Sequence, residues 1–253
     1  MILDFDAGNT RVKWRVLREQ GGDVLDSDAF NFNSDDELSY ALKNIYQNFK
    51  HICYIRVASV RGEQFDQLFY QACFKQFNVQ AKFAAVKTKG FAIEPAYDDP
   101  NQLGVDRWLS MLAAYTVCRK SCAVVSLGSA LTLDLVDDKG SHLGGYILPG
   151  IRSMQRVLGY TTHAVKVDAL NCDGDIAPGK STVTCVRNGL SLMLKSFIYE
   201  AVTLAEFSPP VSVFASGGDA GFLSRQLYDR QELKIEVYCN LVFEGLAIAL
   251  PLP

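Results

Sequence analysis

Apolar and polar positions along this chain follow the two periods of regular secondary structure, with short alternating runs between stretches of helical spacing. In the first half, three predicted strands come in succession, and helices then alternate with further strands. The strands are predicted at residues 2–6, 11–17, 23–32, 51–60 and 79–86, and the helices at 33–49, 63–77 and 105–119. A polar loop at 87–103 separates the last strand from the last helix.

The second half repeats this order of elements. Strands are predicted at 122–126, 130–137, 141–148, 211–215 and 234–238, and helices at 150–158, 181–205, 219–228 and 240–249. The stretch 159–179 is expected to be mobile. Three strands followed by alternating helices and strands, in two copies, predict an α/β fold with two mixed sheets. We expect residues 1–119 and 120–253 to form two subdomains.

A polar turn joins the first two predicted strands. Asp6 lies where the first strand should end, and Gly8 allows close approach of a ligand and unusual φ angles because it has no Cβ. Asn9 and Thr10 offer donors to an anion, and Lys13 adds a positive charge. Such a turn suits a polyphosphate whose hydrated Mg²⁺ is held by the carboxylate. An ordinary tight turn favours the same residue types for backbone reasons alone.

The pattern of this turn recurs in the second half, between the strands predicted at 122–126 and 130–137. Two copies suggest a duplicated α/β unit, with two phosphate-binding hairpins facing each other across a cleft that holds a nucleotide. The aligned positions are Asp6 with Ser126, Gly8 with Gly128, Asn9 with Ser129, and Thr10 with Ala130.

A second candidate site lies at the start of the helix predicted at 105–119. Gly104 precedes this helix, and Asp106 and Arg107 lie in its first turn. The N–H groups of a helix start, together with Arg107, form a natural receptor for a carboxylate, and Asp106 could accept a proton from a substrate hydroxyl. The helix dipole alone also favours an aspartate at this position, so a purely structural role stays open.

Composition and charge narrow the class of protein. Of the 253 residues, 49% are hydrophobic and 21% are charged, which is typical of a soluble globular protein with a substantial core. The net charge of −3 offers no electrostatic footprint for nucleic acid or an anionic membrane. No apolar run reaches the roughly 18 residues of a membrane-spanning helix, and no signal sequence precedes the first strand. We therefore expect a cytoplasmic protein.

The seven cysteines show neither C-x-x-C pairs nor a disulfide framework, which fits a reducing compartment. The three histidines are scattered along the chain, which argues against a zinc site. Five cysteines lie in apolar surroundings and are predicted to be core residues. These are Cys53, Cys73, Cys122, Cys185 and Cys239.

Six segments, taken in order, resemble the motifs of the type III pantothenate kinases, the actin-like form of the first enzyme of coenzyme A synthesis. They are Asp6–Thr10 with Lys13, Gly104–Arg107, Gly128–Ala130, Gly144–Gly150, Gly179–Thr182 and Ser216–Ala220. The resemblance covers nearly the whole chain. It implies a duplicated actin-like (ribonuclease H-like) fold, with two mixed-sheet subdomains flanking a nucleotide cleft. The implied activity is ATP-dependent phosphorylation of pantothenate to phosphopantothenate.

The resemblance also implies a role for each matching position, and Asp106 matches the catalytic base. The positions that match ATP contacts are Asp6, Ala7, Gly8, Asn9, Thr10, Arg11, Val12, Lys13, Ser129, Gly217, Gly218 and Asp219. The positions that match pantothenate contacts are Tyr97, Gly104, Val105, Asp106, Arg107 and Thr182. Segment 144–150 is similar to one beside the substrate pocket, although a strand end with a Pro-Gly turn would read the same way.

The resemblance further implies Mg²⁺ with ATP, bound near Asp6 through water, a monovalent cation such as K⁺ or NH₄⁺, and a homodimer. One residue departs from the family pattern. Ser126 occupies the position of the aspartate that carries the monovalent cation. A neutral hydroxyl attracts a cation less than a carboxylate does, since a unit charge pair at about 4 Å is worth roughly 4 kcal/mol at an effective dielectric of about 20.

Two other functions stay open at this point. The chain could be a catalytically weakened homologue that binds nucleotide or pantothenate and regulates a partner, because a fold does not determine a function. It could also phosphorylate another small hydroxylated substrate. Asp6, Lys13, Asp106 and Arg107 are all present, which favours an active kinase.

Overall fold

The computed structural model describes residues 1–32, 34–161, 175–220, 223 and 231–252, and the chain forms two compact units. Unit 1 contains Met1–Phe91, Asp98–Ala113 and Val242–Pro253, and unit 2 contains Ala92–Tyr97 and Ala114–Leu241. The C-terminal segment thus belongs with the first sheet, and the short segment 92–97 belongs with the second. The subdomain ranges 1–119 and 120–253 stay a prediction.

Unit 1 is built on a five-stranded mixed sheet with the strand order β3-β2-β1-β4-β5. Its strands are β1 (Ile2–Ala7), β2 (Val12–Leu17), β3 (Val24–Phe30), β4 (Tyr54–Ser59) and β5 (Ala81–Phe83). β1 pairs antiparallel with β2 and parallel with β4. The helices are α1 (Asp35–Asn48), α2 (Glu63–Phe77), the start of α3 (Val105–Cys118) and most of α7 (Leu241–Ala249).

Unit 2 has a second five-stranded mixed sheet, with the order β10-β9-β6-β7-β8. Its strands are β6 (Cys122–Leu127), β7 (Ala130–Val136), β8 (His142–Pro149), β9 (Val211–Ser216) and β10 (Leu233–Val237). Here β6 pairs antiparallel with β7 and parallel with β9, as β1 does with β2 and β4. Helices α4 (Ile151–Thr161) and α5 (Thr182–Leu204) follow. The two sheets therefore share one topology, which confirms the predicted duplication.

Most predicted elements are present with the predicted type, and the differences lie at their boundaries. The strand predicted at 79–86 is shortened to β5, which has three residues. The polar loop at 87–103 contains a 3₁₀ turn, η1 (Pro100–Gln102), and an isolated bridge between Glu94 and Ser141. The helix predicted at 219–228 and the stretch 159–179 lie largely outside the described residues.

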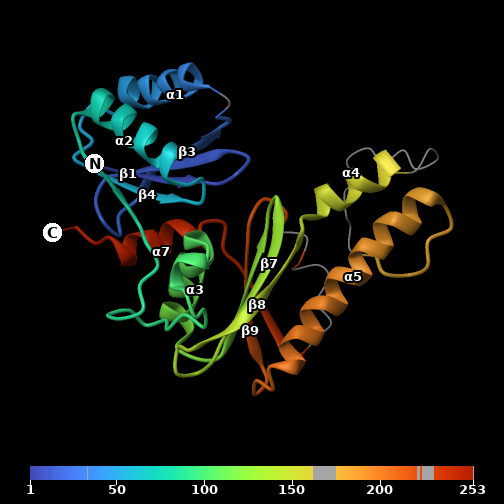
Figure 1. The fold of residues 1–253 in the computed structure, drawn as a ribbon. Helices are drawn as coiled ribbons and strands as arrows, with labels where there is room; N and C mark the ends of the chain where they lie inside the picture. The colour runs from blue at the N-terminus through green and yellow to red at the C-terminus, as the bar shows by residue number, and fades with distance from the viewer. Residues whose placement is uncertain (33, 162–174, 221–222, 224–230, 253) are drawn as a thin grey trace. The chain divides into compact units, whose positions relative to one another are not determined.

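Alternation along β1 sends successive side chains to opposite faces of the first sheet. Leu3, Phe5 and Ala7 are buried in a core shared with residues of α1 and α2. Figure 1 shows these two helices on one side of the sheet. Asp4 and Asp6 therefore face the other side, so the carboxylate near the end of β1 points away from that core.

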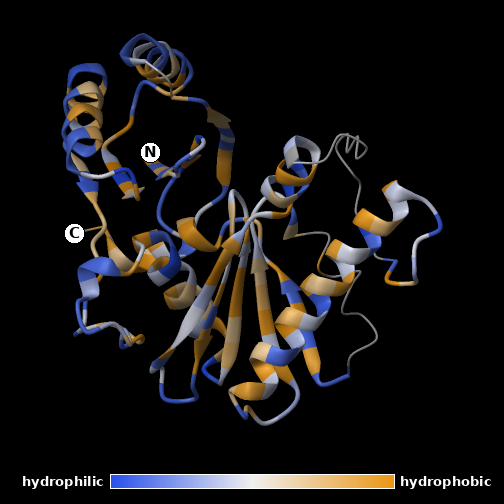
Figure 2. Cartoon of the chain, turned by 45° about the vertical axis from the view of Figure 1, so that its right-hand side comes forward, coloured by the Kyte–Doolittle hydropathy of each residue, from blue (hydrophilic) through white to orange (hydrophobic). Residues whose placement is uncertain are grey.

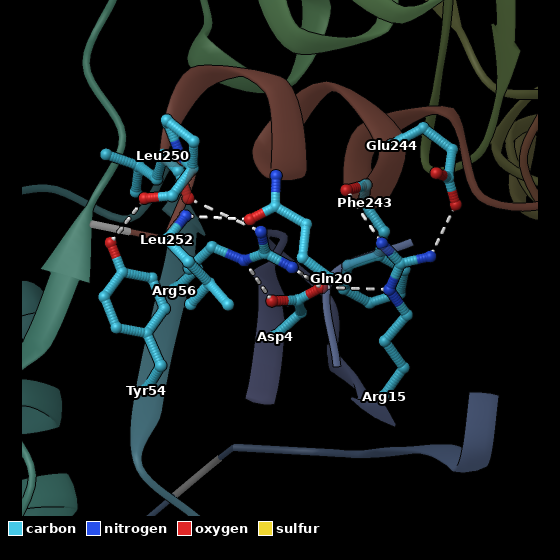
Figure 3. Close-up of polar contacts among 10 residues, drawn as sticks. Asp4, Arg15, Gln20, Tyr54, Arg56, Phe243, Glu244, Leu250 and Leu252 are labelled. Atoms are coloured by element: carbon cyan, nitrogen blue, oxygen red, sulfur yellow. Dashed lines mark hydrogen bonds and ion pairs between the residues drawn. The ribbon is translucent and has the colours of Figure 1, made fainter. Parts of the chain in front are cut away.

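Asp4 is fully buried between two arginines on the neighbouring strands, as Figure 3 shows. Arg15 Nε lies 2.9 Å from Asp4 Oδ2, and Arg56 Nε lies 2.6 Å from Asp4 Oδ1. The same guanidinium groups donate to the carbonyl oxygens of Phe243 and Leu250. Through these hydrogen bonds the arginines hold α7 on the face of the sheet that carries Asp4. Removal of either arginine would leave a buried charge without its full compensation.

In unit 2 the same alternation buries one face of the sheet against α5. Ala123 and Val125 of β6 belong to a core that includes Leu194 and Ile198 of α5. Figure 2 shows hydrophobic residues along the strands of this sheet and hydrophilic residues in the turns that join them. Ser126, one position out of phase with these core residues, faces the opposite side of the sheet.

The prediction that five cysteines are core residues is partly wrong. Cys73 and Cys122 are buried, whereas Cys53, Cys185 and Cys239 are exposed. The exposed cysteines lie just before β4, in the first turn of α5 and just after β10. At the ends of elements, apolar neighbours in the sequence do not cover a side chain. No helix in the described ranges is long and apolar enough to span a membrane.

Candidate active site

The first hairpin places its polar residues as the sequence predicts. Asp6 and Lys13 are directly opposite each other on β1 and β2, and Lys13 Nζ lies 3.4 Å from Asp6 Oδ2. Asn9, Thr10 and Arg11 are exposed at the tip between the strands. The side chains of Ala7 and Val12 are buried in the core, so these two residues can meet a phosphate only through their backbone.

The glycines at the two hairpin tips have a shared property. A Cβ added to Gly8 would lie 3.5 Å from Arg11 O, and one added to Gly128 would lie 3.8 Å from Ala130 O, which are ordinary contact distances. Neither glycine has a positive φ, so the tolerance of Gly8 for unusual φ angles is not used in this structure. The protein itself would tolerate a side chain at either tip. The space that these glycines leave open is therefore available for close approach of a ligand.

Asp6 differs from Asp4, its neighbour on the same face of β1. Two arginines neutralise Asp4, whereas Asp6 faces the ammonium group of Lys13, whose side chain is 36% exposed. Burial raises the pKa of the Asp6 carboxyl; the Lys13 charge opposes this shift, and the nearby Asp106 carboxylate adds to it. Two carboxylates close enough to repel each other form a region that favours a cation.

The Asp106 side chain is placed by the start of α3. A Cβ at Gly104 would lie 2.7 Å from Asp106 Oδ1, so the glycine makes room for this carboxylate. The Arg107 N–H donates to Asp106 Oδ1 at 2.8 Å and fixes its orientation. Arg107 is buried, with 7% of its surface exposed, and Val105 is buried beside it. Unit 1 thus brings Asp6 and Asp106, predicted from separate motifs, into one electrostatic environment.

In unit 2, three separate segments meet at the end of β6. Gly150 N–H donates to Ser129 O at 3.0 Å, and Asp219 N–H donates to Leu127 O at 3.3 Å. Gly217 has φ +97°, and a Cβ there would lie only 2.2 Å from Leu127 O. The structure therefore brings the second hairpin tip together with the predicted Gly217–Asp219 motif. The glycine in that motif is required by the fold itself.

Other predicted site residues of unit 2 lie elsewhere in the unit. Tyr97 ends the segment 92–97 and stacks on His142, while Thr182 is exposed at the first position of α5. Ser126 is partly buried and pairs across the ladder with Thr132.

Sequence reasoning overlooked two polar contacts in unit 2. Arg152 Nη2 lies 3.1 Å from Asp219 Oδ1, and the imidazole of His142 contacts Asp134. Asp134 is 1% exposed, so this charged side chain lies in the interior of unit 2. The available signal was its position: Asp134 is a charged residue within an otherwise apolar strand pattern, next to a strand that begins with a histidine.

Comparisons with known proteins agree on one family. A sequence model described as Type III pantothenate kinase matches residues 2–203. A type III pantothenate kinase from Pseudomonas fluorescens (strain Pf0-1) is 34% identical over 257 residues, covering 100% of both chains. One from Pseudomonas aeruginosa (strain LESB58) is also 34% identical over 257 residues, with the same full coverage.

Solved structures confirm the actin-like architecture. The activator of the 2-hydroxyisocaproyl-CoA dehydratase from Clostridium difficile is similar with a TM-score of 0.56 at 12% identity, covering 98% of this chain and 92% of that chain. The inorganic polyphosphate/ATP-glucomannokinase from Arthrobacter sp. strain KM has a TM-score of 0.50 at 14% identity, covering 98% and 96%. At these identities the likeness shows the fold alone.

Proposed function

Because this chain belongs to the type III pantothenate kinase family, we propose that it transfers the terminal phosphoryl group of ATP to the primary hydroxyl of pantothenate, with Asp106 as the base. The observation that supports the assignment of Asp106 is its electrostatic influence on Asp6. The two carboxylates interact electrostatically although they come from β1 and α3. A phosphate site and a proton acceptor within one unit are what phosphoryl transfer to an alcohol requires.

In the proposed step, a bond forms between the hydroxyl oxygen of pantothenate and the γ-phosphorus of ATP. The bond between that phosphorus and the β,γ-bridging oxygen breaks, and ADP leaves. Asp106 accepts the hydroxyl proton as the new bond forms. The N–H group of Arg107, 2.8 Å from Asp106 Oδ1, keeps the carboxylate oriented toward the acceptor. The Arg107 side chain anchors the pantothenate carboxylate, with Tyr97, Gly104, Val105 and Thr182 as further acceptor contacts.

The phosphates of ATP are assigned to the first hairpin. Asn9, Thr10 and Arg11 present donors at its exposed tip, and Lys13 supplies a positive charge. Mg²⁺ bound with ATP would be held through water by Asp6 and would supply positive charge at the phosphate oxygens, which suits a cation that keeps several waters. The ATP contacts of unit 2 are assigned to Ser129, Gly217, Gly218 and Asp219.

The experiment that tests this function is a product assay with purified protein, Mg-ATP and pantothenate, read by mass spectrometry of phosphopantothenate. Asp106→Asn should lower kcat by about 10² to 10⁴, the usual contribution of a general base, with pantothenate binding retained. A turnover near that of the wild type in Asp106→Asn would remove this residue from the base role. Binding of both substrates without product would instead support the regulatory alternative.

We propose that K⁺ or NH₄⁺ has little effect on this enzyme. Ser126 offers a neutral hydroxyl at the family's cation position, and the carboxylate of Asp134, on the same sheet, is already in contact with His142. Replacing NaCl by KCl should change turnover less than about twofold, because a neutral site discriminates weakly among cations. A turnover that is high in KCl and falls sharply in NaCl would contradict this proposal.

We also propose that the protein is a cytoplasmic homodimer that uses β8 in its interface. β8 is an edge strand of the second sheet, and Leu143, Tyr146 and Ile147 expose between 42% and 60% of their surface. Exposed apolar edge strands are ready sites of association. Light scattering after size-exclusion chromatography should give twice the 28.0 kDa chain mass, and Ile147→Glu should shift it toward the monomer.

A further inference from the structure

A buried histidine and carboxylate in unit 2 have no place in the mechanism described above. His142 of β8 is 3% exposed and Asp134 of β7 is 1% exposed, and His142 Nε2 lies 3.0 Å from Asp134 Oδ1. Burial of such polar groups is unfavourable unless both are hydrogen-bonded. A pair of apolar residues would fill the same space without that cost, so the contacts of this pair indicate its role.

The other ring nitrogen of His142 contacts the segment 92–97. The backbone N–H of Ala96 lies 3.4 Å from His142 Nδ1. A backbone N–H can only donate, so Nδ1 is the acceptor and the ring proton is on Nε2, from which it is donated to Asp134. Asp134 thereby selects the tautomer that can accept from Ala96. The imidazole connects β7 to the segment that precedes Asp98.

Backbone contacts hold the same segment against the start of β8. Glu94 N–H donates to Gly140 O at 3.0 Å, and His142 N–H donates to Glu94 O at 2.9 Å. Gly140 allows this close approach, because it has φ +87° and a Cβ there would lie 2.1 Å from Ala92 O. These contacts fix residues 92–96 along their length, and Tyr97 is the next residue in the chain.

The ring of Tyr97 completes the arrangement. Its plane is within 11° of the His142 imidazole plane, and the ring centroids are 6.1 Å apart. This is within the range of offset stacking between aromatic rings. The backbone before Tyr97 and the ring of Tyr97 therefore both contact one imidazole, whose own orientation is set by Asp134.

We propose that His142, oriented by Asp134, is a positioning residue that presents Tyr97 to the acceptor substrate. The inference rests on the proposed function in one respect, the assignment of Tyr97 to pantothenate. The contacts of the His142 ring are with Asp134, Ala96 and Tyr97, so we expect it to act on acceptor binding through Tyr97. Loss of its hydrogen bonds should raise KM for pantothenate and leave KM for ATP and kcat nearly unchanged.

The main variant is His142→Phe, which keeps an aromatic ring against Tyr97 and loses both hydrogen bonds. We expect KM for pantothenate to rise about tenfold, with KM for ATP and kcat within about twofold of wild type. Asp134→Leu should act in the same direction. Asp134→Asn, whose amide oxygen can still accept from Nε2–H, should restore most of the acceptor affinity.

Two controls separate positioning from a loss of stability. Leu194→Ala opens a cavity in the α5 core of the same unit, so it should lower the melting temperature and leave the ratio of the two KM values unchanged. In a double-mutant cycle, His142→Phe should add no further rise in KM for pantothenate when Tyr97 is already alanine. If His142→Phe does not fold, the two Asp134 variants carry the same comparison.

Three results for His142→Phe would each overturn the inference: equal changes in KM for pantothenate and KM for ATP, an effect on KM that adds fully to that of Tyr97→Ala, or an unchanged KM for pantothenate. A wild-type chain that forms no phosphopantothenate refutes the proposed function instead. Titration calorimetry of pantothenate with the same variants then decides the inference separately. Weaker binding in His142→Phe that disappears in the Tyr97→Ala background supports it, and equal binding, or no binding by the wild type, overturns it.

Discussion

Alanine at the first hairpin tip should separate folding from ATP binding. Gly8 has no positive φ, and a Cβ built on it would meet Arg11 O at 3.5 Å, an ordinary van der Waals distance. The folded state therefore accepts Gly8→Ala without strain. If the hairpin holds the ATP phosphates against its backbone, the added methyl group occupies space that the ligand needs.

The two expected effects have opposite signs. Replacing a glycine where alanine fits stabilises a protein by about 0.4–1 kcal/mol, because the unfolded chain loses conformational freedom. For a chain of this size that corresponds to a rise in melting temperature of roughly 1–4 °C. A displacement of the reacting phosphate by about 1 Å costs roughly 10²-fold in rate, so kcat/KM for ATP should fall by about this factor.

The assay combines a thermal melt without ligand with steady-state kinetics in which ATP and pantothenate are varied separately. Gly245→Ala is a matched control within unit 1, because a Cβ there would lie 2.0 Å from Leu109 O and should lower the melting temperature. An unchanged kcat/KM for ATP in Gly8→Ala would refute the close approach of phosphate to this tip. A lowered melting temperature would show that the glycine serves the fold instead.

Three further outcomes follow from the charges of unit 1. Asp6→Asn should abolish most activity and raise the melting temperature at pH 7. Burial raises the pKa of the Asp6 carboxyl from its ordinary 3.8. The stability contributed by the protonated carboxyl is therefore present below about pH 4 and is lost as pH rises through the raised pKa. Melts between pH 4 and 8 should show the variant's advantage growing with pH, and a constant difference would contradict this. Arg56→Met leaves Asp4 short of a partner and should cost about 3–5 kcal/mol in chemical denaturation, whereas a loss below about 1 kcal/mol would show that Arg15 suffices. Arg107→Lys should raise KM for pantothenate at least tenfold with KM for ATP retained, since lysine lacks the bidentate geometry for a carboxylate; equal KM values would place the anchor elsewhere.

Much of the fold could be predicted from local pattern. The period-two alternation of β1 and β2, the capping residue Ser34 before α1, and the helical spacing of 63–77 each specify an element through neighbours in the sequence. The repeat of the strand-turn-strand pattern predicted the duplication, which the matching topology of the two sheets confirms. The prediction was weakest for β5, because three residues carry little periodicity.

The candidate site was predictable wherever its residues form short motifs. Asp6 and Lys13 lie on adjoining strands of one hairpin, so their pairing follows from the register, and Gly104 with Asp106 follows from the start of a helix. The pair of His142 and Asp134 was missed. The role we infer for the pair depends on its contacts with Ala96 and Tyr97, which are far away in the sequence. An isolated bridge in an irregular loop brings them next to the pair.

By itself the sequence determined the order of most strands and helices, the two matching hairpin turns and the family, because each depends on residues close together in the chain. Only the tertiary structure decided which carboxylate is neutralised by two arginines and which is not. Asp4 and Asp6 are chemically identical and face the same side of β1, but two arginines from neighbouring strands neutralise Asp4, whereas Asp6 faces one lysine and a second carboxylate. Charges brought together by folding set that difference, and no local pattern encodes it.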